Sequence, residues 1–216
     1  MRTSENTALV TLFVKVKAKS GSISKAKSVL LSDVRGAWTE SGNLKMELYS
    51  AEENPDTFYL FERWENQAAL ENHFVQPYTK GAFDLQNGDL DAPIEMNYLT
   101  ELFPKNEKLQ KEAHRPLTTL LVDFKTKPGN GAALQSLFKE FVPIVRNENG
   151  NVEFHFYKVN GNDERFVLYE RWESQAALDA HNQSATTAKL VSAVSELIFG
   201  TVQQSVIFAD DISNSK

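Results

Sequence analysis

The hydrophobic pattern of this chain alternates between the period of a strand and the period of a helix. Residues 9–17 and 117–125 carry β-branched and aromatic side chains with partial alternation, and both runs end before a glycine-containing turn. This pattern predicts a first strand in each half of the chain. Residues 26–37 and 134–145 then place apolar side chains at i, i+3, i+4 and i+7, which predicts an amphipathic helix.

A second strand is expected soon after each helix. We expect the helices to end at Gly42 and Gly150, because glycine commonly terminates helices. The segments "LKMELY", residues 44–49, and "VEFHFY", residues 152–157, follow with alternating polarity.

A tight turn and a third strand complete a hairpin in each half. The triplets at 54–56 and 161–163, "NPD" and "GND", are typical of hairpin turns. They precede the strongly apolar segments 58–64, "FYLFERW", and 166–172, "FVLYERW". Both segments are expected to be strands.

A second helix and a fourth strand close each half. Asn66 and Ser174 stand where a helix N-cap belongs, directly before "QAAL". Residues 94–99, "IEMNYL", and 202–208, "VQQSVIF", are predicted as the fourth strands.

The two halves repeat each other at a spacing of 108 residues. The segments "FYLFERWENQAALENH", residues 58–73, and "FVLYERWESQAALDAH", residues 166–181, are identical at eleven of sixteen positions. Further identities without a gap include Leu12 with Leu120, Gly21 with Gly129 and Glu40 with Glu148. Such register predicts the same fold twice.

The element order β-α-β-β-α-β predicts an α+β fold of two ferredoxin-like repeats, each with its helices on one face of an antiparallel sheet. Phe58 and Leu60 lie on one side of the third strand, whereas Tyr59 and Phe61 lie on the other, so both sides are apolar. One side can pack on the helices, and the other needs a partner sheet. We therefore expect the two sheets to pack face to face as an intramolecular pseudo-dimer.

The predicted domains are residues 1–103 and 117–216. The charged stretch between them, with prolines near both ends, predicts a linker at 104–116. The two repeats would form an intramolecular pseudo-dimer, and the pairing of two whole chains as a homodimer stays open.

The composition of the chain excludes several classes of function. A net charge of −6, with both signs interspersed, gives no basic surface for nucleic acid or anionic lipid. The chain has no cysteine, which excludes thiol catalysis and cysteine-ligated metals. The first apolar run is interrupted by Lys15 and Lys17, so it is too short for a signal peptide or a membrane span. We expect a cytoplasmic protein without nucleic-acid or membrane partners.

The repeated motif, following a β-α-β pattern, resembles the antibiotic biosynthesis monooxygenase domain of the dimeric α+β barrel group, and the resemblance covers nearly the whole chain. It implies that single-domain relatives pair through their sheets and that this chain fuses two such protomers. Relatives include cofactor-free monooxygenases of aromatic polyketides, quinol monooxygenase-like proteins, haem-degrading enzymes and a phospho-autoinducer isomerase.

The site motifs of these subgroups are matched to different degrees. Of the Trp, Asn and Tyr of the polyketide-tailoring members, only the Trp is present, as Trp64 and Trp172. The position of the helical Trp in haem-degrading members holds His73 and His181. Quinol-type and isomerase-type members carry "AH…PH", in which His73 and His181 match the first His. Tyr78, after Pro77, takes the place of the second His in the first repeat, and this subgroup fits best.

His73 and His181 are the candidate catalytic bases, since the ordinary histidine pKa lies near working pH. Trp64 and Trp172 are expected to shape an apolar pocket, with Tyr78 as a further substrate contact. The alternatives are that the histidines pack the helix ends and the tryptophans only seal the core.

Glu62 and Glu170 form a second pair of candidates for the substrate pocket. Alternation turns them to the same side as apolar neighbours on the third strand, where a carboxyl is expected to have a raised pKa or a cationic partner. The alternative is an ion pair with an arginine across the sheet.

No metal site is predicted. His155 aligns with Glu47, so that position differs between the repeats, and no spacing of His and carboxylates indicates a metal. His114 lies in the expected linker and should be solvated.

The sequence thus predicts a cofactor-independent monooxygenase that oxidises a quinol or related small aromatic in an apolar pocket. One alternative is a non-catalytic module that binds or senses a small molecule. The other is an isomerase of a small phosphorylated signalling metabolite, which would need cations that the pattern does not supply. The second helices diverge after the shared motif, so the two pockets need not be equivalent.

Overall fold

The protein is described by a computed structural model that covers residues 8–51, 53–105 and 117–214. The predicted β-α-β-β-α-β order occurs twice, and all strand pairs are antiparallel. Among the described residues, hydrogen-bonded neighbours follow the orders β1-β3-β2-β8 and β8-β5-β7-β6-β4. The α+β fold with two ferredoxin-like repeats is thereby confirmed.

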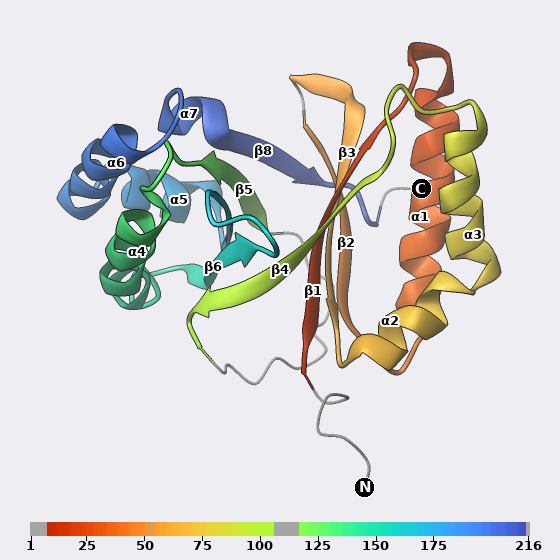
Figure 1. The fold of residues 1–216 in the computed structure, drawn as a ribbon, viewed down its shortest axis with the longest axis horizontal. Helices are drawn as coiled ribbons and strands as arrows, with labels where there is room; N and C mark the ends of the chain where they lie inside the picture. Colours follow the sequence, from red (N-terminus) through yellow and green to blue (C-terminus); the bar gives the residue numbers. More distant parts are fainter. Residues whose placement is uncertain (1–7, 52, 106–116, 215–216) are drawn as a thin grey trace, which may run out of the picture. The chain divides into compact units, whose positions relative to one another are not determined.

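The first repeat contributes four strands and three helices (Figure 1). In chain order they are β1 (Val10–Lys17), α1 (Ile23–Ala37), β2 (Asn43–Ala51), β3 (Asn54–Trp64), α2 (Gln67–Phe74), α3 (Pro77–Asp84) and β4 (Glu95–Phe103), with short 3-10 turns at Ser20–Ser22 and Leu85–Asn87.

The second repeat has the same order with one additional short helix. Its elements are β5 (Thr118–Lys125), α4 (Gly131–Val145), β6 (Asn151–Val159), β7 (Arg165–Trp172), α5 (Gln175–Asn182), α6 (Ala185–Leu197), α7 (Val202–Ser205) and β8 (Val206–Asp211). None of the helices built from described residues is long and apolar enough to cross a membrane.

The described chain forms two compact units whose limits differ from the repeat limits. Of the described residues, the first unit contains 8–51, 53–98 and 210–214. The second contains 99–105 and 117–209. The domain limits expected at 103 and 117 stay a prediction, and residues 106–116 of the expected linker, His114 among them, lie outside the described residues.

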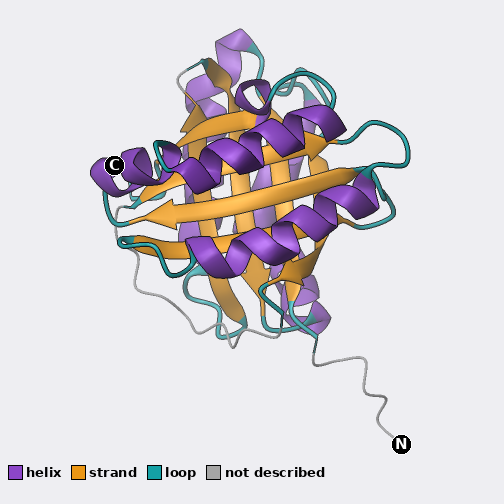
Figure 2. Cartoon of the chain, turned by 90° about the vertical axis from the view of Figure 1, so that its left-hand side faces the viewer, coloured by secondary structure: helices purple, strands orange, loops and turns teal. Residues whose placement is uncertain are grey.

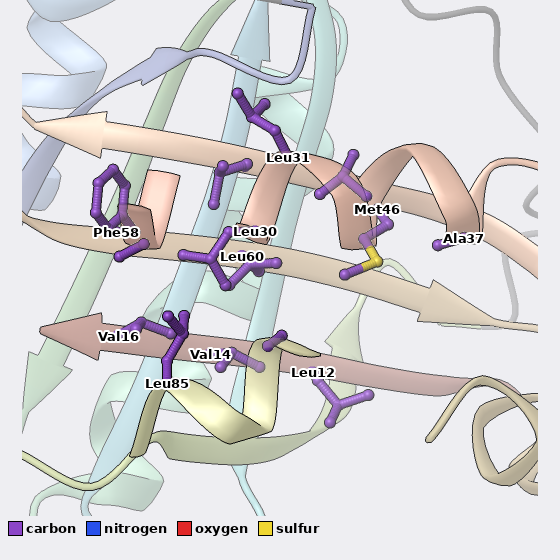
Figure 3. Packing of buried hydrophobic residues seen from close by; sticks show 14 of the residues in the cluster. Leu12, Val14, Val16, Leu30, Leu31, Ala37, Met46, Phe58, Leu60 and Leu85 are labelled. Carbon is purple, nitrogen blue, oxygen red and sulfur yellow. The ribbon is translucent and has the colours of Figure 1, made fainter. Parts of the chain in front are cut away.

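In the first unit, β3 is the central strand. It pairs with β1 on one side and β2 on the other, so that Val14 and Leu48 both lie opposite Leu60. Asp210 and Asp211, at the end of β8, pair with β2. The core lies between this sheet and α1, where the leucines and valines of β1 and β3 meet Leu30 and Leu31 (Figure 3).

In the second unit, β7 takes the central position. It pairs with β5 and β6, and β8 extends the sheet beyond β5. Residues Leu99–Phe103 of β4 pair with β6. Helices α4 and α6 cover one face of this sheet (Figure 2). The core on that face is rich in phenylalanine, with Phe138 and Phe156 stacked 3.9 Å apart.

The expected second helix is broken in two in each repeat, which is a correction to the sequence interpretation. Gln76 has an extended backbone, and Pro77 begins α3 at a position where proline needs no hydrogen-bond donor. In the second repeat, Ser184 is extended and its hydroxyl caps α6 at Thr187 N.

The expected strand at 202–208 is also partly wrong. Residues 202–205 form α7, because Thr201 and Gln204 make a reciprocal capping box that starts a helix there. The strand begins only at Val206.

One of the two expected hairpin turns lies elsewhere than predicted. The triplet 54–56 already belongs to β3, whereas residues 161–163 do lie in the turn between β6 and β7. The first helices end at Ala37 and Val145, before the glycines. Gly42 and Gly150 instead lie where the next helix passes: a Cβ on either would collide with Ala69 or Ala177.

Candidate functional site

Each repeat places its histidine where the end of one helix meets the central strand. In the first repeat, Asn66 caps α2 through its side chain and so fixes the start of the helix that carries His73. Trp64 ends β3 immediately before this cap. The imidazole of His73 lies against the Trp64 ring, with centroids 4.5 Å apart. His73 is almost fully buried.

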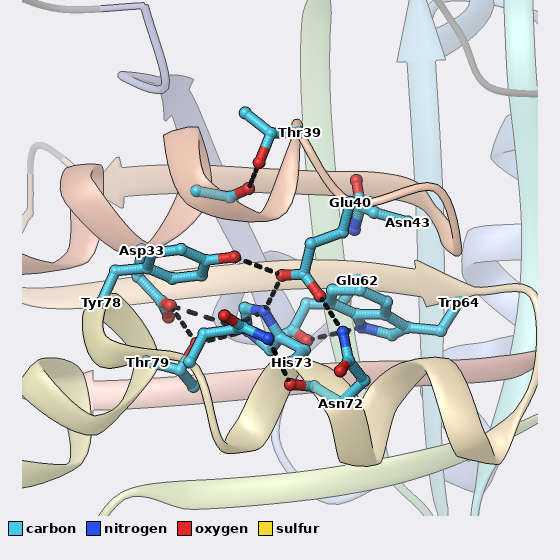
Figure 4. Close-up of polar contacts among 12 residues, drawn as sticks. Asp33, Thr39, Glu40, Asn43, Glu62, Trp64, Asn72, His73, Tyr78 and Thr79 are labelled. Atoms are coloured by element: carbon cyan, nitrogen blue, oxygen red, sulfur yellow. Dashed lines mark hydrogen bonds and ion pairs between the residues drawn. The ribbon is translucent and has the colours of Figure 1, made fainter.

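The two nitrogens of His73 both face carboxylates (Figure 4). Nδ1 lies 2.7 Å from Oε1 of Glu40, a residue in the turn after α1. Nε2 lies 3.6 Å from Oδ1 of Asp33, a residue of α1 itself. The Thr79 hydroxyl, from α3, donates to Asp33 Oδ1 at 2.7 Å and lies 3.3 Å from both His73 nitrogens. Burial raises the pKa of Asp33, and the charge of His73 opposes this.

Glu62 lies on the same side of β3 as His73, as alternation predicts. Its Oε2 accepts a hydrogen bond of 3.0 Å from the Trp64 indole. Burial raises the pKa of Glu62 to about 7, although the charge of His73 and the indole bond act in the opposite direction. At neutral pH this carboxyl can therefore hold a proton or release it.

A small apolar pocket opens next to these groups. Its cavity volume is about 30 Å³, room for one or two water molecules. The polar lining consists of Asp33, Glu62, His73 and Thr79. The rest is apolar, supplied by β1, β3, the helices and the start of β4: Val14, Val16, Leu30, Leu60, Phe74, Ala82, Phe83, Ile94 and Met96.

The second repeat builds the same arrangement around His181. Its Nδ1 lies 2.7 Å from Glu148 Oε2, and its ring lies 4.7 Å from the Trp172 ring. The Thr187 hydroxyl is 3.4 Å from both ring nitrogens. Burial lowers the pKa of His181, and the hydrogen bond with Glu148 opposes this shift.

Glu170 corresponds to Glu62. Its Oε2 accepts a 2.9 Å hydrogen bond from the Trp172 indole. Burial raises the pKa of Glu170 to about 7, against the effect of this hydrogen bond. Neither glutamate forms the expected alternative, a cross-sheet ion pair with arginine, among the interactions described for it.

The second pocket is larger and more apolar than the first. Its cavity volume is about 80 Å³. Glu170, His181, Asn182 and Thr187 are its polar members. The rest of the lining consists of leucines and valines together with four phenylalanines: Phe124, Phe138, Phe141 and Phe154.

The sequence-predicted residues divide into pocket lining and support. Both histidines and both glutamates line their pockets. Trp64 and Trp172 stand behind them, in contact with His and Glu of the same repeat, rather than in the lining.

Tyr78 lies outside the pocket lining as well. Its hydroxyl donates to Glu40 Oε1 at 2.9 Å (Figure 4). Burial and this hydrogen bond raise the pKa of Tyr78 to about 12. It is thus a second contact of the carboxylate that holds His73.

Sequence reasoning missed the carboxylates that orient the histidines. Glu40 and Glu148 are identical between the repeats, a signal that was visible but not tied to the histidines 33 residues away. Asp33 lies on the apolar stripe of α1, where a polar residue is itself unusual.

His155 belongs to a separate cluster on the other side of β6. Its Nδ1 lies 2.7 Å from Glu101 Oε1. Among the described residues, no three His, Asp or Glu side chains are arranged to hold a metal ion.

Comparison with solved structures supports the fold. A putative monooxygenase from Fusobacterium nucleatum subsp. nucleatum superimposes with a TM-score of 0.76 at 16% identity, over 94% of each chain. A putative monooxygenase from Lactobacillus acidophilus NCFM gives a TM-score of 0.69 at 12% identity, over 89% of this chain and 90% of the other.

Sequence comparison identifies the family. The Bacillus subtilis (strain 168) protein described as "Putative monooxygenase YcnE" is 30% identical over 74 residues, which make up 34% of this chain and 78% of that protein. The family model described as antibiotic biosynthesis monooxygenase matches residues 9–85 and again 118–192, together more than half of the chain. The chain therefore belongs to the antibiotic biosynthesis monooxygenase family and carries its domain twice.

Proposed function

We propose that the protein is a cofactor-independent monooxygenase that oxidises a quinol or a related small aromatic. The observation that carries this proposal is the buried His–Glu pair beside an apolar pocket in each repeat, at 2.7 Å in both. A carboxylate on Nδ1 fixes the ring and favours a proton there, so that a substrate proton can be accepted only at Nε2. Family membership supports the same class of reaction.

The reaction needs a base and a pocket from which bulk water is excluded. A quinol O–H gives its proton to imidazole Nε2, and the resulting phenolate, a much better electron donor than the neutral quinol, passes an electron to O₂. Recombination forms a C–O bond on the ring and a hydroperoxide. Its O–O bond then breaks, which leaves one oxygen on the ring as a hydroxyquinone and releases the other as water. One quinol and one O₂ thus give one hydroxyquinone and one H₂O.

Glu62 and Glu170 suit the proton donor for the departing oxygen. Each lines its pocket, and each has a pKa near 7, so a substantial fraction is protonated at neutral pH. The apolar walls would stack on the aromatic ring. Trp64 and Trp172 would act through Glu and His rather than touch the substrate.

Oxygen consumption tests the proposal. The full-length protein, with a chelator and no added cofactor, should consume O₂ with at least one member of a panel of benzo- and naphthohydroquinones. The variant His73→Gln/His181→Gln should lose the catalysed rate, by about 100-fold or more if a general base is removed. Absence of uptake above the uncatalysed rate with every quinol would contradict the proposal.

A non-catalytic binding module remains the competing function. The apolar pockets would serve it equally well, and its signature would be a ligand that binds and is recovered unchanged after aerobic incubation. The isomerase of a phosphorylated metabolite receives no support, because neither described pocket lining includes Lys or Arg.

A further inference from the structure

The two histidines differ in what faces their second nitrogen. In the first repeat, Asp33 Oδ1 lies 3.6 Å from His73 Nε2. At the repeat spacing of 108, the position of Asp33 is held by Phe141. The Phe141 ring meets the His181 ring edge-on, with centroids 6.2 Å apart.

This difference decides which imidazole has a lone pair to offer. A proton on Nδ1 of either ring is held by glutamate at 2.7 Å. In the first repeat a second carboxyl group, Asp33, lies 3.6 Å from Nε2 and favours a proton there as well. In the second, Phe141 and Phe154 cannot accept a proton, so Nε2 of His181 keeps its lone pair.

The remaining groups around His181 do not change this result. Glu170 on β7 is hydrogen-bonded to the Trp172 indole. Thr187 on α6 lies 3.4 Å from both ring nitrogens, and a hydroxyl that donates to Nε2 leaves that nitrogen without a proton of its own. Asn182 on α5 is the other polar member of the lining.

The cavity volumes also favour the second repeat as the site of this reaction. The cavity beside His181 is about 80 Å³, against about 30 Å³ beside His73. The larger cavity is lined by leucines, valines and four phenylalanines, an apolar surface that suits a flat, neutral aromatic molecule. The smaller one presents two carboxyl groups, Asp33 and Glu62, to whatever enters.

We propose that the two repeats have divided their roles: His181 is the catalytic base and deprotonates a neutral aromatic O–H in the second pocket, whereas Asp33 occupies Nε2 of His73 and makes the first pocket a poor site for this step. This inference rests on the proposed function. In the step itself, the O–H bond breaks, the proton forms an N–H bond at Nε2, and the electron pair stays on the substrate oxygen. Glu148 then faces the imidazolium across Nδ1.

The protonation of the two rings can be observed without any substrate. Long-range ¹H–¹⁵N correlation of the full-length protein with ¹⁵N-labelled histidine, at pH 7, reports each nitrogen separately, and His73→Gln and His181→Gln assign the signals. We expect one protonated and one bare nitrogen for His181, and a larger protonated fraction at Nε2 of His73 than at Nε2 of His181. Identical patterns, or a bare Nε2 in His73 alone, would overturn the inference.

Asp33→Asn provides a matched test, because the amide keeps an oxygen for Thr79 but removes the charge. It should lower the protonated fraction at Nε2 of His73 and leave the His181 pattern unchanged. Asp179→Asn, on the exposed side of α5, is the control and should change neither. An unchanged His73 pattern in Asp33→Asn would contradict the role given to Asp33.

Turnover supplies the second readout. His181→Gln should lower the oxygen-consumption rate about 100-fold, and His73→Gln less than 10-fold. An equal or larger loss in His73→Gln would overturn the division of roles. If the unmodified protein consumes no oxygen with any quinol, the proposed function fails, and the nitrogen pattern alone decides whether the two rings differ.

Discussion

At the scale of single residues, the unusual groups are two buried glutamates that keep their protons up to about pH 7. Glu62 and Glu170 each have only an indole N–H as a described hydrogen-bond partner, and burial dominates their pKa. A carboxyl whose pKa is higher in the folded than in the unfolded chain favours folding at low pH. That contribution is lost as pH rises through about 7.

Glu170→Gln should therefore change how stability depends on pH. The difference in unfolding free energy, variant minus unmodified protein, should rise by about 3 kcal/mol between pH 4.5 and pH 8, because a pKa shift from 4.5 to about 7 no longer opposes folding. Urea unfolding over this range measures it. Glu173→Gln removes an exposed carboxylate of the same repeat, and a similar slope in this control would contradict the prediction.

The same residues predict the pH profile of the proposed reaction. kcat/KM should rise at a pH below 6.5, because burial lowers the pKa of His181, and should fall near pH 7 as Glu170 loses its proton. Glu170→Gln should abolish the upper limb while keeping the lower one. Steady-state oxygen consumption over pH 5–9 tests this, and an upper limb that persists in the variant would exclude Glu170 as the proton donor.

At the scale of elements, the turns before β2 and β6 set the position of the histidine-bearing helices. Gly150 has a φ of +80° and lies so close to α5 that a Cβ would meet Ala177 Cβ at 2.6 Å. Gly129 has nearly the same φ, +81°, but nothing within 4 Å. The pair separates the effect of close packing from that of backbone conformation.

Gly150→Ala should destabilise the protein by about 3 kcal/mol, from left-handed backbone strain and overpacking together. Gly129→Ala should lower the unfolding free energy by only about 1 kcal/mol, because it adds left-handed backbone strain without overpacking. Thermal or urea unfolding of both variants measures the difference. Equal losses would show that α5 can move away without cost.

Several elements could be predicted from the sequence because the signal is local. The caps Asn66 and Ser174 were predicted from residue type and position, and the side-chain oxygen of each accepts a hydrogen bond from a backbone N–H at the helix start. The break between α2 and α3 was missed, although Pro77 marks it. In the second repeat the break between α5 and α6 depends on the extended backbone of Ser184, which no strong sequence signal predicts.

Only those site residues could be predicted that recur in both repeats or that strand alternation turns to the apolar side. His73, His181, Glu62 and Glu170 recur in both repeats, and strand alternation turns both glutamates toward the apolar side. The partners Glu40 and Asp33 approach His73 from α1 and the turn after it, so the contact exists only after the helices pack on the sheet. A single sequence carries no direct record of such a contact.

At the scale of the whole molecule, the compact units do not each correspond to one continuous stretch of sequence. The first unit uses residues at the far end of the sequence: Ser213 is buried, its hydroxyl accepts a hydrogen bond of 2.8 Å from Leu48 N, and Ile212 N donates to Leu48 O at 2.9 Å. The end of the chain therefore stabilises β2, the neighbour of the strand that carries Glu62.

Ser213→Ala should destabilise the protein by about 1 kcal/mol and speed hydrogen exchange at the Leu48 amide, because a buried donor loses its partner. Amides of β7, in the other unit, should keep their exchange rates. Ser205→Ala, whose hydroxyl bonds Thr201 O on the exposed helix α7, is the matched control. Unchanged exchange at Leu48 would contradict the contribution of Ser213.

The proposed monooxygenase function requires that a buried histidine, held by a carboxylate, activates a small aromatic for direct reaction with O₂. Incubation of the full-length protein with a reactive quinol under ¹⁸O₂, followed by mass spectrometry of the product, tests this most directly. The account predicts one ¹⁸O atom in each hydroxyquinone and none above background with His73→Gln/His181→Gln. Quinol recovered without added oxygen, or equal labelling by this double variant, would contradict it.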